Sequence, residues 1–200
     1  DPSTCKDIEM DGSLKFGLDM LMTHLAFLKN LVHLHLHGDP RSPWRDNHHQ
    51  RLSFALLGTL LSLKTLDTRC HVYSTDGGFG LLPRSLERIT IVGPCFEEVL
   101  GADGTTQSPS LVDLPPRLVV FRPSECGYKP EDVLIEWPST LREVSFLARG
   151  WRDIHVLAFA NLLPAGCLTY LQGSIMTNGT ILARPGIEPS MTGLVTFDDM

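Results

Sequence analysis

A short block with the pattern L-x-x-L-x-L recurs along the chain, and a repeat of this kind limits the architecture more than any local feature does. The clearest copy runs from Leu31 to Leu36 (LVHLHL). The copies begin at Cys5, Leu31, Leu63, Leu86, Leu118, Leu141, Leu168 and, in a faint eighth copy, Met191. The successive intervals are therefore 26, 32, 23, 32, 23, 27 and 23 residues. Such a period predicts an architecture of repeated units, each contacting its neighbours.

Apolar and polar residues alternate inside each block, and this pattern predicts a half-buried β-strand. The fourth and sixth positions are mostly apolar, as in Leu34 and Leu36, whereas the third, fifth and seventh positions are mostly polar. Each strand is too short to bury its apolar face alone, so we expect the strands to lie side by side in one parallel sheet. Parallel neighbours need a crossover connection, and every interval is long enough to supply one.

Three of the crossovers have apolar residues at the three-and-four spacing that predicts a helix. They cover residues 18–28, about 46–61 and 153–163, with Asp46 and Asp153 as expected N-caps. The stretch 101–114 is rich in glycine, serine and proline and predicts a surface loop instead.

A proline precedes four of the blocks at a matching position. These prolines are Pro83, Pro115, Pro138 and Pro164. Proline cannot continue a helix, so we expect each one to end a crossover and lead an extended chain into the strand. Trp137 holds the place that leucine takes in the other lead-ins, and we expect it to pack in the core.

These blocks and their L-P-x-x-L lead-ins resemble the leucine-rich repeat family from Cys5 to about Gly173. The resemblance implies an α/β solenoid with a curved parallel sheet and with helices and loops on the convex side. Residues 1–200 would form one domain of seven to eight repeats. The incomplete last block suggests a piece of a longer chain. The family has asparagine or cysteine at a turn position where this chain has Asp39, His71 and Pro94, so we expect irregular turns.

The resemblance also implies a role in binding proteins. The long steps with helical crossovers are similar to the repeats attached to F-box domains, which implies recognition of substrates for a ubiquitin ligase. Within such a solenoid, the third, fifth and seventh positions of each block face out of the concave surface. From these positions we predict a partner-binding surface that contains His33, His35, His37, Asp67, Arg69, Arg88, Arg122 and Tyr170. Any solvated sheet face is polar, so polarity alone does not identify a site.

Composition narrows the classes of partner and location. The net charge of -6 argues against a nucleic-acid surface, which would need a basic stripe. No run of 18 apolar residues is present to span a membrane. The five cysteines are odd in number and lack a C-x-x-C spacing, which disfavours a disulfide framework or a zinc ribbon. We therefore expect an intracellular, cytoplasmic protein whose partner is another protein.

The run His33, His35, His37 leaves one enzymatic alternative open, a metal-dependent hydrolase. Alternate strand residues lie on one face about 7 Å apart, so two of these histidines could bind a transition metal together with Glu9. The later blocks, however, lack the further ligands that such hydrolases need. Motifs for a nucleophile or a phosphate-binding loop are also absent. We therefore predict a binding protein without a cofactor and not an enzyme.

Overall fold

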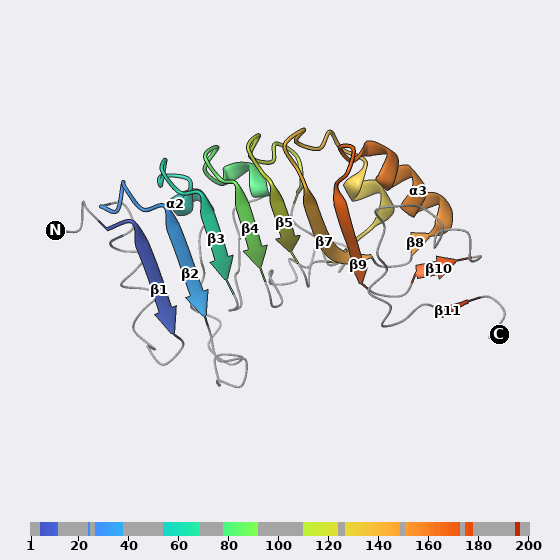
Figure 1. Cartoon of the computed structure of the whole chain (residues 1–200), viewed down its shortest axis with the longest axis horizontal. Coiled ribbons are helices and arrows are strands. Elements are labelled where there is room, and N and C mark those ends of the chain that lie inside the picture. Colours follow the sequence, from blue (N-terminus) through green and yellow to red (C-terminus); the bar gives the residue numbers. More distant parts are fainter. Residues whose placement is uncertain are drawn as a thin grey trace, which may run out of the picture.

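The computed structural model describes residues 5–11, 24, 27–37, 54–68, 78–91, 110–123, 127–148, 151–172, 175–177 and 195–196. Most of the described strands form one eight-stranded sheet, in the order β1-β2-β3-β4-β5-β7-β6 with β9 also paired to β7 (Figure 1). The strands are β1 (Asp7–Asp11), β2 (His33–His37), β3 (Thr65–Thr68), β4 (Arg88–Ile91), β5 (Val120–Pro123), β6 (Gly127–Tyr128), β7 (Glu143–Ala148) and β9 (Leu168–Gln172).

All pairings in this sheet are parallel, and from β1 to β7 their register follows the sequence blocks. The fourth residue of each block lies beside the fourth residue of the next. This row consists of Ile8, Leu34, Leu66, Ile89, Phe121 and Val144. From Leu34 to Val144 its side chains are fully buried, so the period-two pattern places one face of the sheet in the core. The predicted α/β class with a mostly parallel sheet is confirmed.

A common turn leads into the strands. The N–H of the first block residue donates to the carbonyl three residues earlier, as Leu86 does to Pro83 at 3.1 Å and Leu141 to Pro138 at 3.0 Å. Leu31 makes the same bond to Leu28. The lead-in proline therefore supplies the carbonyl that opens the turn, and its fixed φ suits this position.

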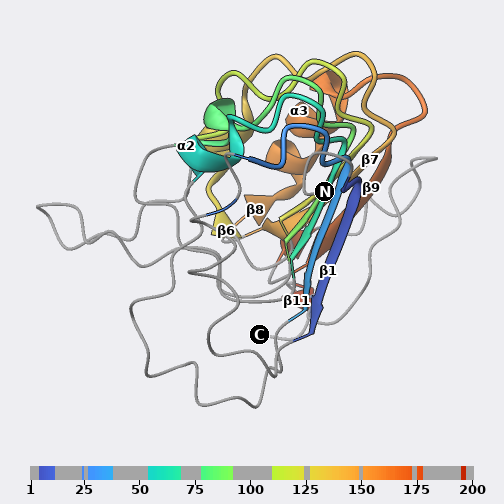
Figure 2. The same cartoon turned by 90° about the vertical axis from the view of Figure 1, so that its left-hand side faces the viewer.

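The helices lie on one face of the main sheet (Figure 2). They are α2 (Phe54–Leu57), the 3-10 helices η3 (Phe79–Leu81) and η4 (Pro130–Val133), and α3 (Asp153–Leu162). The helix expected at 153–163 is confirmed. Of the one expected at 46–61, residues 54–57 are helical, and its first part, with Asp46, falls outside the described residues. Most residues of the helix expected at 18–28 and of the loop expected at 101–114 also lie outside the described residues.

The assignment of Asp153 as an N-cap is wrong. The chain runs from the short strand β8 (Trp151–Arg152) straight into α3, so the extended residue before the helix is Arg152. Its N–H donates to Nδ1 of His155 at 3.1 Å, and Asp153 is the first helical residue. A carboxylate in the first turn still interacts favourably with the helix dipole.

A second, three-stranded parallel sheet has the order β11-β10-β8. Its other members are β10 (Ile175–Thr177) and β11 (Val195–Thr196). The described end of the faint eighth block is β11, which pairs with β10 and not with β9. The expectation that this block adds a strand to the main sheet is therefore wrong for its described part.

Aromatic rings fill much of the space between the main sheet and the helices. Phe121 contacts Phe79 and Trp137 at ring-centroid distances of 5.0 and 6.2 Å, and Trp137 contacts Phe159 at 5.5 Å. The indole N–H of Trp137 donates to the Val133 carbonyl at 3.1 Å, so its polar atom is satisfied in the core. The predicted core role of Trp137 is confirmed, because only 5% of it is exposed.

The last block begins one residue earlier than its sequence suggests. The N–H of Cys167, not that of Leu168, donates to the Pro164 carbonyl, after a left-handed turn at Gly166 with φ of 76°. Thr169 and Leu171 then face the core beside Val144 and Phe146, whereas Leu168 lies beside Glu143 and is 44% exposed. The turn is thus shifted by one residue and the strand register by two. Cysteine serves here as a small buried apolar residue, so a frame drawn through leucines alone misplaces this strand.

Candidate partner-binding surface

The main sheet has a face opposite the helices, and within the described part of the chain no helix covers it (Figure 2). We call it the open face. Two rows of residues from neighbouring strands cross it in register. The third-position row is Asp7, His33, Thr65, Arg88, Val120 and Glu143, and the fifth-position row is Glu9, His35, Asp67, Thr90 and Arg122. The strands therefore bring together side chains that are widely separated in the sequence.

Histidines and carboxylates meet at the β1 to β3 end of the open face. His33 Nε2 lies 3.9 Å from Asp7 Oδ1, and His35 Nδ1 lies 3.6 Å from Asp67 Oδ2. The two imidazoles are stacked with ring centroids 6.4 Å apart. Both nitrogen–oxygen distances exceed those of a hydrogen bond. The imidazoles therefore only partly compensate the two carboxylates.

Asp67 is the least satisfied of these acids. Its side chain is 20% exposed, and its Oδ1 has no hydrogen-bond partner among the residues that the structure describes. A poorly solvated carboxylate oxygen without a donor raises the free energy of the folded protein. Oδ1 itself is buried, so a partner could lower this free energy only through the charge of a cation placed over the exposed part of the side chain.

The β5 to β7 part of the open face is internally compensated. Arg122 donates through Nε and Nη2 to Oε1 of Glu143 on the neighbouring strand β7. The Glu143 side chain is only 15% exposed, so it is more shielded from water than the side chains of Asp7 and Asp67. A charged partner gains little by approaching this pair.

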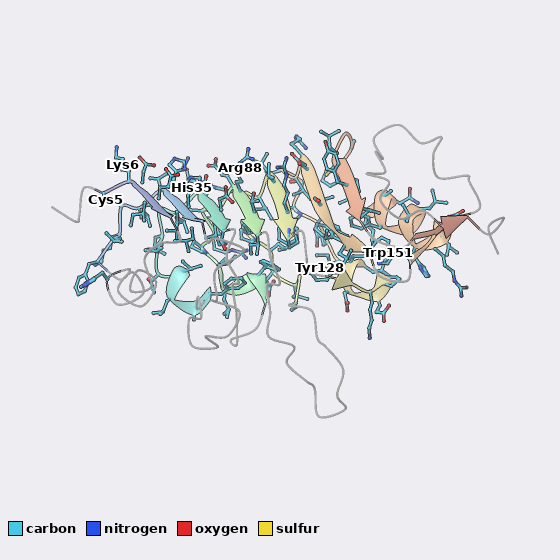
Figure 3. All side chains as sticks on the ribbon, turned by 90° about the horizontal axis from the view of Figure 1, so that it is seen from below. Cys5, Lys6, His35, Arg88, Tyr128 and Trp151 are labelled. Atoms are coloured by element: carbon cyan, nitrogen blue, oxygen red, sulfur yellow. The ribbon has the colours of Figure 1, made fainter. Side chains whose placement is uncertain are left out.

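Arg88 is an exposed cation in the middle of the open face, and it projects from the sheet on the side away from α2 (Figure 3). Its neighbours in register are Thr65 and Val120, which carry no charge. Among the described residues it forms no ion pair. Arg88 is therefore available to a carboxylate that comes from another molecule.

The structure brings five predicted partner-binding residues together on this face, namely His33, His35, Asp67, Arg88 and Arg122. Tyr170 lies at the other end of the sheet, in register with Ser145, and is half-buried. Arg69 and the side chain of His37 lie outside the described residues. Binding by any of them stays a prediction.

Two positions expected to be exposed are buried. Val120 is 5% exposed and Ser145 is 6% exposed. Val120 lies in register between Arg88 and Glu143, whose longer side chains can cover it. Alternation predicts which face a residue joins, but the size of its neighbours decides how much water reaches it.

The sequence interpretation missed one ion pair at the edge of the open face. Lys64 Nζ lies 2.9 Å from Glu87 Oε1, with both side chains about half exposed. Each is the second residue of its block, and the two blocks are consecutive. Opposite charges at the same position of neighbouring blocks were the signal that could have identified this pair.

The described residues contain no group of three or more histidine, cysteine, aspartate or glutamate side chains that could hold a metal ion. His33, His35 and Glu9 therefore do not form such a group in the described part. The hydrolase alternative also involves His37, whose side chain lies outside the described residues, and it stays a prediction. Nor is any described helix long and apolar enough to cross a membrane.

Comparison with known proteins adds no identification. No protein-family model matches the chain, and neither a curated protein nor a solved structure does. The sequence pattern and the geometry of the open face are therefore the features that bear on function.

Proposed function

We propose that this chain is a protein–protein interaction module of the leucine-rich repeat type, a curved solenoid that binds a partner protein through the open face. The observation that carries the proposal is the register of the blocks, which aligns one polar residue from each of five strands in the fifth-position row. Repeated strands that present such rows make an extended binding surface.

The distribution of charge supports the same role. Carboxylates that the histidines only partly compensate lie at one end of the open face, and Arg88, which forms no ion pair with a described residue, lies in its middle. Complementary charges steer a partner and fix its orientation more than they add affinity. The residues that we propose for contact are the eight predicted from the sequence, namely His33, His35, His37, Asp67, Arg69, Arg88, Arg122 and Tyr170.

A narrower form of the proposal is that the chain selects substrates for a ubiquitin ligase. It depends on the similarity of the helical crossovers of this chain to those of F-box-associated repeats. One such crossover within the described residues is α3. We also propose an intracellular, cytoplasmic location, because Cys5 and Cys167 are free thiols. The narrower form requires that ubiquitination of a captured partner falls when this chain is depleted from cells.

Capture of partners from a cell lysate tests the general proposal. Arg88→Glu should weaken capture by about tenfold or more, because it reverses a cation that forms no ion pair with any described residue. Arg117→Glu is the matched control, since Arg117 is also exposed but precedes β5 outside both rows. Both variants should keep the melting temperature of the wild type. Equal capture by Arg88→Glu and wild type would mean that the open face is the wrong surface.

A further inference from the structure

Ion pairing divides the open face into a charged part and a neutral part. Arg122 and Glu143 neutralise each other, and beyond them Ser145 and Tyr170 carry no charge. Glu9 and Arg88 form no ion pair with a described residue, and Asp67 has only the 3.6 Å contact with His35. Among the described residues of the open face, the charges that are not fully compensated are therefore the acids Asp7, Glu9 and Asp67, followed by the base Arg88.

Their positions in the sheet set the spacing that a ligand must match. Glu9, His35 and Asp67 are neighbours in one row, so the two acids lie two strands apart, at about 10 Å for a strand spacing of ~4.8 Å. Arg88 lies on the next strand and two residues nearer its start, which places it about 8 Å from Asp67. Alternate side chains of an extended chain are separated by about 7 Å, so one short segment can reach all three groups.

We infer that the open face binds an extended peptide segment with basic side chains over Glu9 and Asp67 and a carboxylate over Arg88. This inference rests on the proposed function and names the chemistry of the partner. A basic group over Asp67 would supply charge to a carboxylate whose Oδ1 lacks a donor in the described part. A wholly acidic ligand is disfavoured, because among the described residues it would meet Asp7, Glu9 and Asp67, with Arg88 as the only arginine there that lacks an ion pair.

Selection from a random peptide display library on the folded chain tests the inference. Recovered peptides should carry at least two Lys or Arg and one Asp or Glu more often than the unselected pool does. A recovered peptide should bind Asp67→Asn about fivefold more weakly than wild type, which is the upper range for a partly exposed ion pair. Arg88→Gln should remove the preference for an acidic residue and keep the preference for basic ones.

Glu131→Gln and Arg117→Gln serve as matched controls, because both residues are exposed and lie outside the two rows. They should leave peptide affinity unchanged, and circular dichroism should report a native fold for every variant. Recovered peptides that are apolar, acidic or without charge preference would overturn the inference, as would the recovery of none. If lysate capture still depends on Arg88 in that case, the proposed function stands and only the partner chemistry fails.

Discussion

At the scale of single residues, two arginines of the open face differ in what their substitution would test. Arg122 forms a cross-strand ion pair with Glu143, whereas Arg88 forms none with a described residue. The Glu143 carboxylate is only 15% exposed, so it depends on the arginine that donates to it. Charge reversal at Arg122 would therefore disturb the fold as well as any partner contact. Arg88 lacks such a partner in the described part and is the cleaner probe of binding.

Arg122→Gln should lower the free energy of unfolding by about 1 to 2 kcal/mol, because it leaves a poorly solvated carboxylate without its cation. Adding Glu143→Gln should recover most of this loss, since the unpaired charge is then removed. Urea denaturation of the two single variants and the double variant measures the coupling. Strictly additive effects would show that the pair contributes nothing.

Cys167 gives a second residue-scale prediction through its environment. Burial raises the pKa of the Cys167 thiol to about 11, the Arg142 guanidinium lowers this pKa in part, and Glu143 raises it further. Between the ordinary pKa of 9.0 and about 11, the folded state keeps a proton that the unfolded state releases. The contribution of this thiol to stability is therefore complete below pH 9 and is lost as the pH rises toward 11.

Cys167→Ser removes this titration. From pH 8 to about pH 10, wild type should lose roughly 1 kcal/mol more stability than the variant. Chemical denaturation at the two pH values measures the difference, and the comparison cancels the titration of other groups. An equal loss in both proteins would indicate a thiol that titrates normally.

At the scale of elements, the start of β9 shows how local chemistry sets register. Six of the seven clear blocks lie in the register that the sequence indicates, whereas the turn of the seventh begins at Cys167 and its strand is shifted by two residues. Gly166 allows the left-handed backbone that tightens this turn, and no heavy atom lies within 4 Å of the position that a Cβ would occupy there. Any other residue would be strained by its backbone conformation alone.

Leu141 and Leu168 are both first residues of their blocks in the sequence pattern, but the structure predicts that truncating them has different effects on stability. Leu141→Ala should cost about 2 to 5 kcal/mol, because Leu141 is fully buried at the start of its block. Leu168→Ala should change stability by less than about 0.5 kcal/mol, because Leu168 is exposed. Thermal and urea denaturation of both variants decide the matter. Similar losses of stability in both variants would mean that Leu168 is the first residue of its block, as the sequence pattern indicates.

At the scale of the whole molecule, the sequence predicted the features that depend on periodicity. Alternating apolar residues identified the strands of the main sheet from β1 to β7, except β6, and their parallel order. The short strands β6, β8 and β10 have too few residues to show a period. The pairs Lys64–Glu87 and Arg122–Glu143 depend on register and side-chain conformation together, so the alternation alone could not predict them.

The central claim is that the open face is the binding surface, and the dissociation constant of a captured partner tests it most directly. Four charge reversals should be compared: Arg88→Glu and Asp67→Lys on the face, and Arg117→Glu and Glu131→Lys outside the two rows. The first two should weaken binding by about tenfold or more, and the other two should leave it unchanged. The claim would be contradicted if all four variants had the same dissociation constant, or if only the two control variants bound the partner more weakly than wild type.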